Sequence, residues 1–379
     1  MLNPFRYGGV VGRDAFCNRS IEIRDLTRAM RQGERLFVYS ERRLGKTSLV
    51  RLAMEELSGP EYVPVYVDLW PTDGEESFIN VTAKALTEAF ETSTERMIQL
   101  AGSLFKRLLP VLTVDDQGHP QIRFEARELK EEALPLEEVL SAPARIADKR
   151  KCRVVMILDE FQRILEYKSD RIERTLRSVI QNQSDVSYIF LGSRKHLIQQ
   201  MVLDSASPLY RAGGHYPLGP ISANEWIPFI RERFERSDRR IGEPEIRFIC
   251  DLTGGHPFYT QHLCHAAWEL CAESEAVDEK TIESAVKLLL DRETYAYTAL
   301  WESLTSAQRR TLIGLASEPH GAQLFGADFV RTYRLQSAST VQSAVRALLD
   351  RDLIDRENGS FLILDRFFRL WIRRNAHRD

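Results

Sequence analysis

A chain of 379 residues is too long for one ordinary hydrophobic core, so its length predicts two or three domains. A composition of 43% hydrophobic and 28% charged residues is typical of a soluble globular protein, and the net charge of -3 excludes an overall field that would attract nucleic acid or a membrane. The sequence has neither the apolar core of a signal peptide nor a run of ~20 apolar residues that spans a bilayer, so we expect a cytoplasmic protein without membrane contact.

Motifs of zinc enzymes and serine hydrolases are missing from the sequence. The five cysteines form no C-x-x-C pair, which favours buried free thiols over a metal or redox site. The eight histidines include no H-E-x-x-H motif, and no G-x-S-x-G motif occurs. These patterns disfavour a zinc enzyme and a serine hydrolase.

The first predicted helix spans residues 20–32. Ile23, Leu26 and Met30 fall on one helical face, and Gly33 ends the pattern. The segment Val11-Gly12-Arg13 leads into this helix. From the residues alone, these elements are only an N-terminal helix and the segment that precedes it.

The next stretch has the order strand, loop and helix. The apolar run 36–39 enters a polar turn and leaves through Gly45-Lys46-Thr47 into a helical pattern, which is the context of the phosphate-binding P-loop G-x-x-x-x-G-K-[ST]. In such a loop backbone N–H groups face a polyphosphate, Lys46 reaches the outer phosphates, and the Thr47 hydroxyl binds Mg²⁺. The alternative is a surface turn that contains Gly-Lys-Thr by chance. The predicted nucleotide contacts are Ser40, Arg43, Leu44, Gly45, Lys46, Thr47 and Ser48.

The loop departs from the pattern at its first position. Ser40 stands where the motif has glycine, so the first turn must accommodate a Cβ atom.

After the P-loop helix the sequence predicts a second buried strand at 63–68, helices at 78–89 and 95–108, a hairpin with its turn at 115–120, and a helix at 136–149.

A fully apolar strand at 153–158 ends in two carboxylates, Asp159 and Glu160. Such strands lie in the middle of parallel sheets, and ligands bind at their carboxyl ends. We interpret this as a Walker B motif, in which Asp159 holds Mg²⁺ and Glu160 activates the attacking water. The alternative is a strand whose end is exposed to solvent and carries acidic residues without a function. The P-loop about 110 residues upstream favours the Walker B interpretation, because both halves of a Mg–ATP site then follow in the expected order.

Two further candidate residues lie near the next strands. Ser193 follows the predicted strand 188–192, where it either senses the γ-phosphate or caps the following helix. Arg211 precedes the predicted strand 215–218, where it either reaches the phosphates of a neighbouring subunit or is an ordinary surface residue.

From residue 223 onward the pattern becomes helical. Helices are predicted at 225–235, 244–252, 257–268, 278–290 and 292–304. Pro257 is placed at a first helical turn, after Gly254-Gly255-His256. This segment is either a plain interhelical turn or a place where the Pro257 ring stacks on adenine.

The last part of the chain predicts a winged helix. Three short helices at 306–315, 326–333 and 339–349 precede a hairpin with an Asn358-Gly359 turn. The third helix carries Gln342, Ser343 and Arg346 on outward positions, as a DNA-reading helix would. Twelve arginines against eight acidic residues from Ser303 onward give only a mild positive charge, which leaves DNA binding and a protein-facing role open. A final amphipathic helix at 365–374 is expected to pack on this domain.

Together these motifs resemble the archaeal-ATPase family of P-loop ATPases, which is related to AAA+ and STAND proteins. The resemblance is carried by Asn3-Pro4-Phe5, Val11-Gly12-Arg13, residues 42–48, residues 158–162, Gly192-Ser193, Gly255-His256-Pro257 and residues 365–371. It implies an α/β P-loop core with parallel strand order 5-1-4-3-2 at 1–221, a helical lid at 222–302 and a winged-helix domain at 303–379. It also implies ATP and Mg²⁺ as ligands, with Val11, Gly12, Arg13 and Pro257 near the adenine.

Three functions are consistent with these features. The first is a magnesium-dependent ATPase, with slow turnover, that acts as a nucleotide switch and assembles with copies of itself when nucleotide is bound. The second is an ATP-controlled DNA-binding protein that resembles archaeal origin-recognition factors. The third is a protein-interaction switch in stress or phage defence.

Overall fold

The computed structural model describes residues 2–57, 59–114, 120–126, 135–318, 323–357 and 359–375. The chain divides into two compact units. One unit is Arg19–Gly219, and the other combines Met1–Asn18 with Pro220–Asp379. The first eighteen residues, which we expected in the core segment 1–221, therefore group with the helical part of the chain.

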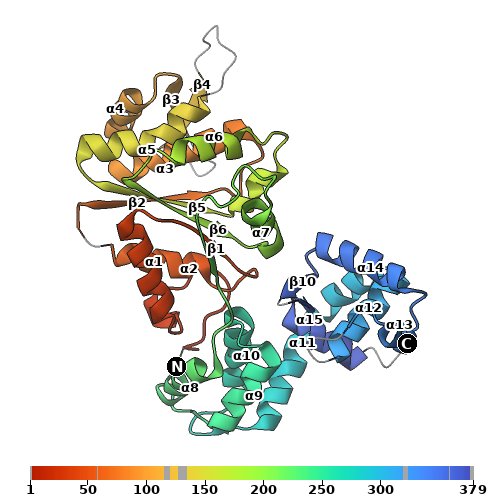
Figure 1. The fold of residues 1–379 in the computed structure, drawn as a ribbon. Helices are drawn as coiled ribbons and strands as arrows, with labels where there is room; N and C mark the ends of the chain where they lie inside the picture. Colours follow the sequence, from red (N-terminus) through yellow and green to blue (C-terminus); the bar gives the residue numbers. More distant parts are fainter. Residues whose placement is uncertain are drawn as a thin grey trace. The chain divides into compact units, whose positions relative to one another are not determined.

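The unit Arg19–Gly219 is built on a five-stranded parallel sheet. Its strands lie in the order β2-β5-β6-β1-β7, which is the predicted order 5-1-4-3-2 and confirms the P-loop ATPase fold class. In Figure 1, α1 and α2 lie on one face of the sheet, and α3, α5 and α6 lie on the other. The strands are β1 (Arg35–Tyr39), β2 (Tyr62–Asp68), β5 (Arg153–Asp159), β6 (Val186–Gly192) and β7 (Gly214–Pro217).

The central strands are apolar because helices cover both faces of the sheet. All seven residues of β6 are buried, and the rings of Phe37 and Phe190 stack with their centroids 4.5 Å apart. Burial of such side chains stabilises the fold by about 25 cal/mol per Å² of apolar surface. The strand register aligns Tyr39 with Gly192 and Asp68 with Asp159, so the carboxyl ends of the strands meet at one edge.

The helices of this unit follow the predicted pattern, with two differences. The helix predicted at 95–108 ends at Leu104, because Leu108 begins a strand, and α6 was not predicted. The predicted hairpin is present, although its turn 115–119 lies outside the described residues. The elements are α1 (Ser20–Gln32), α2 (Lys46–Glu55), α3 (Glu75–Phe90), α4 (Thr94–Leu104), β3 (Leu108–Val114), β4 (Pro120–Ala126), α5 (Leu136–Arg150), α6 (Arg171–Ile180) and α7 (Lys195–Leu203).

The second unit begins with a helical part. The two helices predicted at 278–290 and 292–304 are one helix of 24 residues, so that prediction was wrong. No glycine or proline lies between Leu290 and Arg292 to interrupt the backbone hydrogen bonds. The elements are α8 (Ala223–Glu235), β8 (Arg240–Ile241), α9 (Glu243–Thr253), α10 (Pro257–Leu270), β9 (Ala276–Val277) and α11 (Glu279–Glu302).

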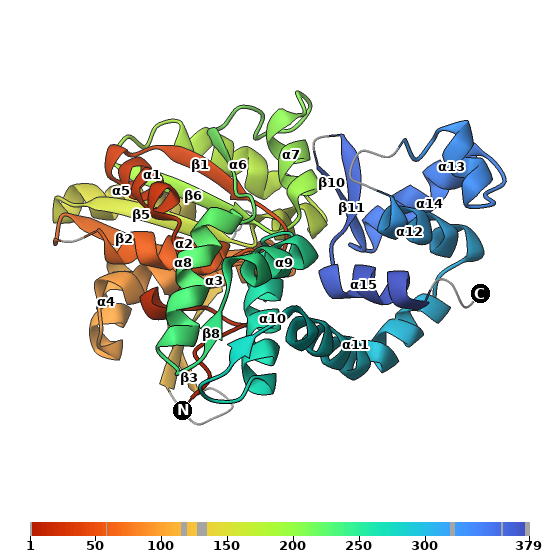
Figure 2. The ribbon, with the colours of Figure 1, turned by 90° about the horizontal axis from the view of Figure 1, so that it is seen from below.

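The second unit ends in the predicted winged helix. Its last helix, α15, lies between α11 and α12 (Figure 2), and the ring of Phe368 packs on Tyr297 of α11. The N-terminal residues also join this unit, since Tyr7 stacks on His262 of α10 with ring centroids 3.8 Å apart. The elements are α12 (Ser306–Ser317), α13 (Ala327–Thr332), α14 (Ala338–Asp350), β10 (Ile354–Glu357), β11 (Ser360–Ile363) and α15 (Arg366–Asn375).

Candidate functional site

The parallel sheet brings three predicted motifs to neighbouring positions. The P-loop follows β1, the acidic pair ends β5, and Ser193 follows β6, which lies between β1 and β5. The Ser40 N–H donates a hydrogen bond to the Gly192 carbonyl at 3.2 Å, so the P-loop begins against the end of β6. The carboxyl edge of this sheet therefore carries the candidate site, as expected for open α/β sheets.

The P-loop has two residues in the left-handed region. Arg43 has φ 60° and Gly45 has φ 90°, and Gly45 is the cap from which α2 begins at Lys46. Glycine adopts this backbone conformation without the steric cost of a Cβ atom. The loop therefore turns directly into a helix N-terminus, which is a site for anions.

Ser40 occupies the position where the motif has glycine. It is not among the residues with positive φ, so its backbone accepts a Cβ atom, and its side chain is buried. The Ser40 hydroxyl donates to the Glu41 carbonyl at 2.8 Å and accepts from Lys46 Nζ at 2.9 Å. The departure from the motif thus gives the loop a hydroxyl that holds the lysine.

Lys46 is a buried cation. Its side chain is 5% exposed, and Nζ also donates to the Glu41 carbonyl at 3.0 Å. Burial lowers the pKa of Lys46 to about 8, although Glu160 and Asp159 act in the opposite direction. Because a buried charge is stabilised by a nearby opposite charge, an anionic ligand here would strengthen the protonated form.

Asp159 accepts three hydrogen bonds. Thr47 Oγ1 donates to its Oδ2 at 2.8 Å, Tyr66 OH donates to the same oxygen at 2.5 Å, and the Glu160 N–H donates to Oδ1 at 2.8 Å. The structure thus brings together Thr47 and Asp159, the two residues predicted to hold a metal. Their oxygen atoms are of the type that Mg²⁺ prefers, and one or two protein oxygens suffice when substrate phosphates supply the others. The residues present therefore fit Mg²⁺.

Tyr66 was not among the predicted site residues. It lies on β2 opposite Ile157 of β5, and its ring carries the hydroxyl to the end of the neighbouring strand. Burial and the negative charge of Asp159 raise the pKa of Tyr66, so its hydroxyl stays a donor. The sequence shows a tyrosine inside an apolar strand. This predicts a buried hydroxyl that needs a hydrogen-bond partner, but it does not predict which residue that partner is.

Glu160 belongs to a ring of hydrogen bonds with Gln162 and Ser193. Its backbone is left-handed, with φ 53°, at the start of the short helix η2 (Phe161–Glu166). Ser193 Oγ donates to Glu160 Oε2 at 2.6 Å, and Gln162 Nε2 donates to the same carboxylate. Gln162 Nε2 also donates to Ser193 Oγ, and the Ser193 N–H donates to Gln162 Oε1, both at 3.3 Å. The predicted base and the predicted sensor are therefore in direct contact.

The glycine before Ser193 is required for this arrangement. A Cβ atom on Gly192 would lie 2.3 Å from Ile198 Cγ1 and 3.1 Å from Gln162 Oε1. Gln162 is 2% exposed and was not among the predicted site residues, although it stands in the family-like segment 158–162. Its contact with Glu160 follows from the turn of η2.

Most of the remaining predicted residues lie outside the unit that carries the P-loop. Val11, Gly12, Arg13 and Pro257 belong to the unit formed by 1–18 and 220–379, so their adenine contact stays a prediction. Pro257 does open α10 at its first turn. Arg211 is exposed, has φ 52° and lies over the Tyr210 ring at 5.1 Å, and its role toward a neighbouring subunit also stays a prediction.

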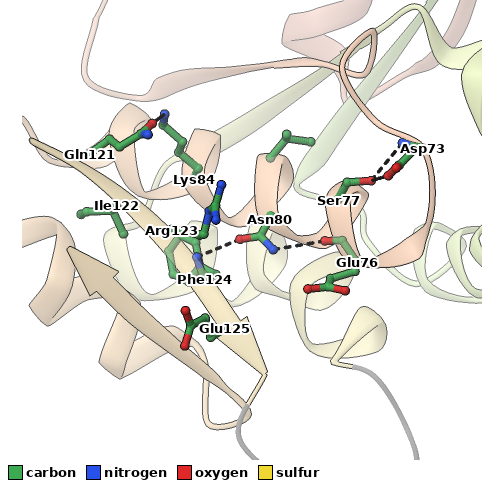
Figure 3. A pocket seen from close by; sticks show the side chains of 11 residues that line it. Asp73, Glu76, Ser77, Asn80, Lys84, Gln121, Ile122, Arg123, Phe124 and Glu125 are labelled. Atoms are coloured by element: carbon green, nitrogen blue, oxygen red, sulfur yellow. Dashed lines mark hydrogen bonds between the residues drawn. The ribbon is translucent and has the colours of Figure 1, made fainter. Parts of the chain in front are cut away.

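A separate cavity of about 430 Å³ lies between α3 and β4 (Figure 3). At its centre Asn80 accepts a hydrogen bond from the Phe124 N–H at 2.8 Å and donates to the Glu76 carbonyl at 3.3 Å. No predicted site residue lines this cavity. Among the described residues there is also no group of three or more His, Cys, Asp or Glu side chains placed to hold a metal, and no helix that could cross a membrane.

Comparison with known proteins supports the assignment of both parts of the chain. Residues 16–263 match the family of ATPase domains found predominantly in Archaea, and residues 295–374 match a probable winged helix domain. No curated protein matches the sequence.

Two solved structures show the same fold at low identity. The Walker-type ATPase PABY2304 of Pyrococcus abyssi is 16% identical, with 97% of this chain and 98% of that chain covered and a TM-score of 0.64. The ORC2 protein of Aeropyrum pernix, solved as ADPNP-ADP complexes, is 12% identical, with 96% and 95% covered and a TM-score of 0.54. With a P-loop, an acidic strand end and a matching family model over more than half of its length, this chain belongs to the family of ATPase domains predominantly from Archaea, here joined to a winged helix domain.

Proposed function

We propose that this chain is a magnesium-dependent ATPase whose bound nucleotide switches the protein between two conformations, as in AAA+ and STAND proteins. The observation that carries the proposal is the contact between Thr47 and Asp159, which joins the P-loop to the acidic strand end. The buried cation of Lys46 lies in the same loop and favours a polyphosphate.

Each residue of the site has a role in this proposal. Lys46 and the loop amides bind the β- and γ-phosphates, and Thr47 and Asp159 hold the metal. Bound Mg²⁺ would neutralise charge on these phosphates. Glu160 orients the attacking water and accepts its proton, and Ser193 contacts the γ-phosphate. The family match and the fold support an ATPase in general, and these roles are our assignment.

The resting position of Glu160 supports slow turnover. Its Oε2 atom accepts from both Ser193 and Gln162, which fixes the orientation of the carboxylate, and this oxygen must exchange one of these donors before it can bind a water molecule. If Ser193 turns to the γ-phosphate when ATP binds, Glu160 is released only in the ATP state. Such a difference in contacts between ATP and ADP is what a switch requires.

Nucleotide binding and turnover test this proposal directly. In Lys46→Ala we expect loss of the thermal stabilisation that ATP gives the wild type, because the loop loses its phosphate-binding cation. In Glu160→Gln we expect binding to be retained and turnover to be lost. Wild-type turnover in Glu160→Gln would remove Glu160 from the mechanism, and a full thermal shift in Lys46→Ala would place the nucleotide elsewhere.

We also propose that residues 222–302 form a lid and that residues 303–379 bind a partner, with duplex DNA as the candidate. Gln342, Ser343 and Arg346 are exposed along α14, the helix that would read the major groove. The test is affinity for a random-sequence duplex at several salt concentrations, with Arg346→Ala as the variant. Affinity that falls steeply with salt supports phosphate contacts. Absence of binding at low salt would favour a protein partner.

Self-assembly gives Arg211 its proposed role. Light scattering with a slowly hydrolysed ATP analogue should show a larger species than with no nucleotide. In such an assembly Arg211→Ala should lose turnover and keep nucleotide affinity, because an arginine supplied in trans stabilises charge in the transition state. A monomer under both conditions would leave Arg211 as a surface residue.

A further inference from the structure

Arg19 is a buried arginine at the point where the chain enters the unit Arg19–Gly219. Its side chain is 3% exposed, and its backbone has φ 64°, in the left-handed region that few residues other than glycine adopt. A buried charge persists only when it is paired and hydrogen-bonded, and a strained backbone persists only when its surroundings fix it. Both features indicate that the position of this guanidinium is strongly determined.

The guanidinium of Arg19 reaches three separate segments. Nη1 donates to Glu22 Oε1 at 3.1 Å, on the first turn of α1. Nη2 donates to the Gly219 carbonyl at 2.8 Å and to the Leu44 carbonyl at 3.4 Å. One planar group therefore connects the first residue of the unit, its last residue and the P-loop. Arginine suits this role because its donors are held in a rigid fork.

The contact with Leu44 determines how a P-loop peptide is oriented. The Leu44 carbonyl and the Gly45 N–H belong to the same planar trans peptide, so they point in opposite directions. When Arg19 holds the carbonyl, the Gly45 N–H is directed away from the Arg19 guanidinium. This amide belongs to the loop residue with φ 90° that caps α2, which makes it one of the donors available to a phosphate.

Residues 218 and 219, the exit segment of this unit, are also bound at the start of the same loop. The Leu218 N–H donates to the Tyr39 carbonyl at 2.9 Å, and Tyr39 is the residue immediately before the P-loop. Residues 218 and 219 thus connect to the loop at its start through Tyr39 and near its end through Arg19. The chain passes to the other unit directly after Gly219.

We infer that Arg19 is a positioning residue that couples nucleotide occupancy of the P-loop to the exit segment 218–219. The inference rests on the proposed function, because it requires that the P-loop binds nucleotide. A bound phosphate fixes the Leu44–Gly45 peptide, this peptide fixes the Arg19 fork, and the fork fixes the Gly219 carbonyl. The coupling is reciprocal. The factor by which bound nucleotide favours the position of Gly219 seen here equals the factor by which displacement of Gly219 lowers nucleotide affinity.

Amide exchange of the wild-type protein is the first test and needs no variant. We expect ADP at saturating concentration to slow hydrogen exchange in the segment 214–219 as well as in the P-loop, because the exit segment opens less often when the loop is fixed. Slower exchange in the P-loop with no change in 214–219 would overturn the inference.

Arg19→Met is the second test, with Arg24→Met as the control. Methionine keeps much of the apolar stem and removes every side-chain donor, and Arg24 is an exposed arginine on α1, the helix that Arg19 precedes. We expect Arg19→Met to bind ADP at least about tenfold more weakly, since it loses charge-assisted hydrogen bonds that orient a phosphate donor. At ADP concentrations that saturate the variant, the slowing of exchange in 214–219 should be lost, while Arg24→Met behaves as wild type.

Arg19→Lys separates positioning from stability. A lysine keeps the charge and lacks the planar fork, so it should hold one carbonyl and recover part of the affinity lost in Arg19→Met. Wild-type affinity and wild-type protection of 214–219 in folded Arg19→Met would overturn the inference. If the wild type itself binds no nucleotide, the proposed function fails instead, so the two failures are distinguishable.

Discussion

Thr47 Oγ1 donates to Asp159 Oδ2 at 2.8 Å, although 112 residues separate the two positions in the chain. This contact joins the helix after the P-loop to the end of β5, at the place that we propose for a metal ion. In the proposed function, Thr47 and Asp159 would hold Mg²⁺ together with phosphate oxygens, and the ion would neutralise charge on the phosphates.

The first prediction concerns metal removal. We expect ADP to raise the thermal midpoint of the wild type more with Mg²⁺ than with EDTA, because the metal links the nucleotide to Thr47 and Asp159. In Thr47→Val the Mg²⁺ increment should disappear, while the shift in EDTA remains through Lys46 and the loop amides. Differential scanning fluorimetry measures both shifts, and an unchanged Mg²⁺ increment in Thr47→Val would exclude Thr47 as a ligand.

The second prediction concerns Tyr66→Phe, which removes one of the three donors to Asp159. We expect the free energy of unfolding in urea to fall by about 1 to 3 kcal/mol, because the lost bond is to a charged group. The Mg²⁺ concentration for half-maximal ADP binding should also rise, since Asp159 is less well oriented. Tyr62→Phe on the same strand is the matched control. A rise in both variants would mean that the strand, and not the hydroxyl, is responsible.

The third prediction concerns Gln162→Leu. This change removes a donor that holds Glu160 and leaves the Ser193 N–H without its acceptor. We expect lower stability, by about 1 to 3 kcal/mol, and faster ATP turnover per folded molecule, because Glu160 is then held by fewer donors. Nucleotide affinity should stay within about twofold, since the hydrogen bonds of Gln162 in the structure go to Glu160 and Ser193.

Steady-state kinetics corrected for the folded fraction measure this effect, with Gln181→Leu on the exposed end of α6 as the control. Slower turnover would show that Gln162 positions Glu160 for the reaction and does not restrain it.

The fourth prediction concerns pH. Burial lowers the pKa of Lys46 to about 8, from 10.5 in an unfolded chain. A bound polyphosphate favours the charged ammonium and raises this pKa, so the complex binds more protons than the free protein above pH 8. The affinity for ADP should therefore be nearly constant just below pH 8 and fall as the pH rises above it.

Isothermal titration at pH 8.5 to 9.5 in buffers of different ionisation enthalpy measures the expected proton uptake. Lys46→Arg is the control, because an arginine stays charged throughout this range and gives no such slope, even where its affinity is lower. Equal slopes in wild type and Lys46→Arg would assign the titration to another group.

The same linkage has the opposite sign for the stability of the free protein. Between pH 8 and 10.5 the unfolded chain binds more protons at Lys46 than the folded chain does. The cost of burying the charged lysine is therefore present below pH 8 and is relieved as the pH rises through that range. Burial of the Lys46 charge thus opposes folding below pH 8 when no anionic ligand is bound.

Local patterns predicted most elements of this chain. The helix 20–32 with its stop at Gly33 matches α1 and its left-handed cap. The apolar strand before Asp159 matches β5, and the winged helix has its three helices and two strands. These features depend on residues that are close in sequence, namely periodicity, caps and turns, so they are readable without the fold.

Two predictions failed for different reasons. The division of α11 into two helices was a local error, because no glycine or proline interrupts this 24-residue helix. The grouping of residues 1–18 with the second unit depends on contacts such as that between Tyr7 and His262. The residues around either position give no indication of a contact between residues so far apart in the sequence.

The sequence by itself determined the chemical groups of the site: a lysine and a threonine after a glycine, and two carboxylates after an apolar strand. Only the tertiary structure decided which of these groups touch, because strand order places Tyr66 beside Asp159, and the turn after β5 places Gln162 between Glu160 and Ser193. Hydrogen bonds between neighbouring strands depend on register and distance, and these are set by packing of the whole sheet and not by spacing along the chain.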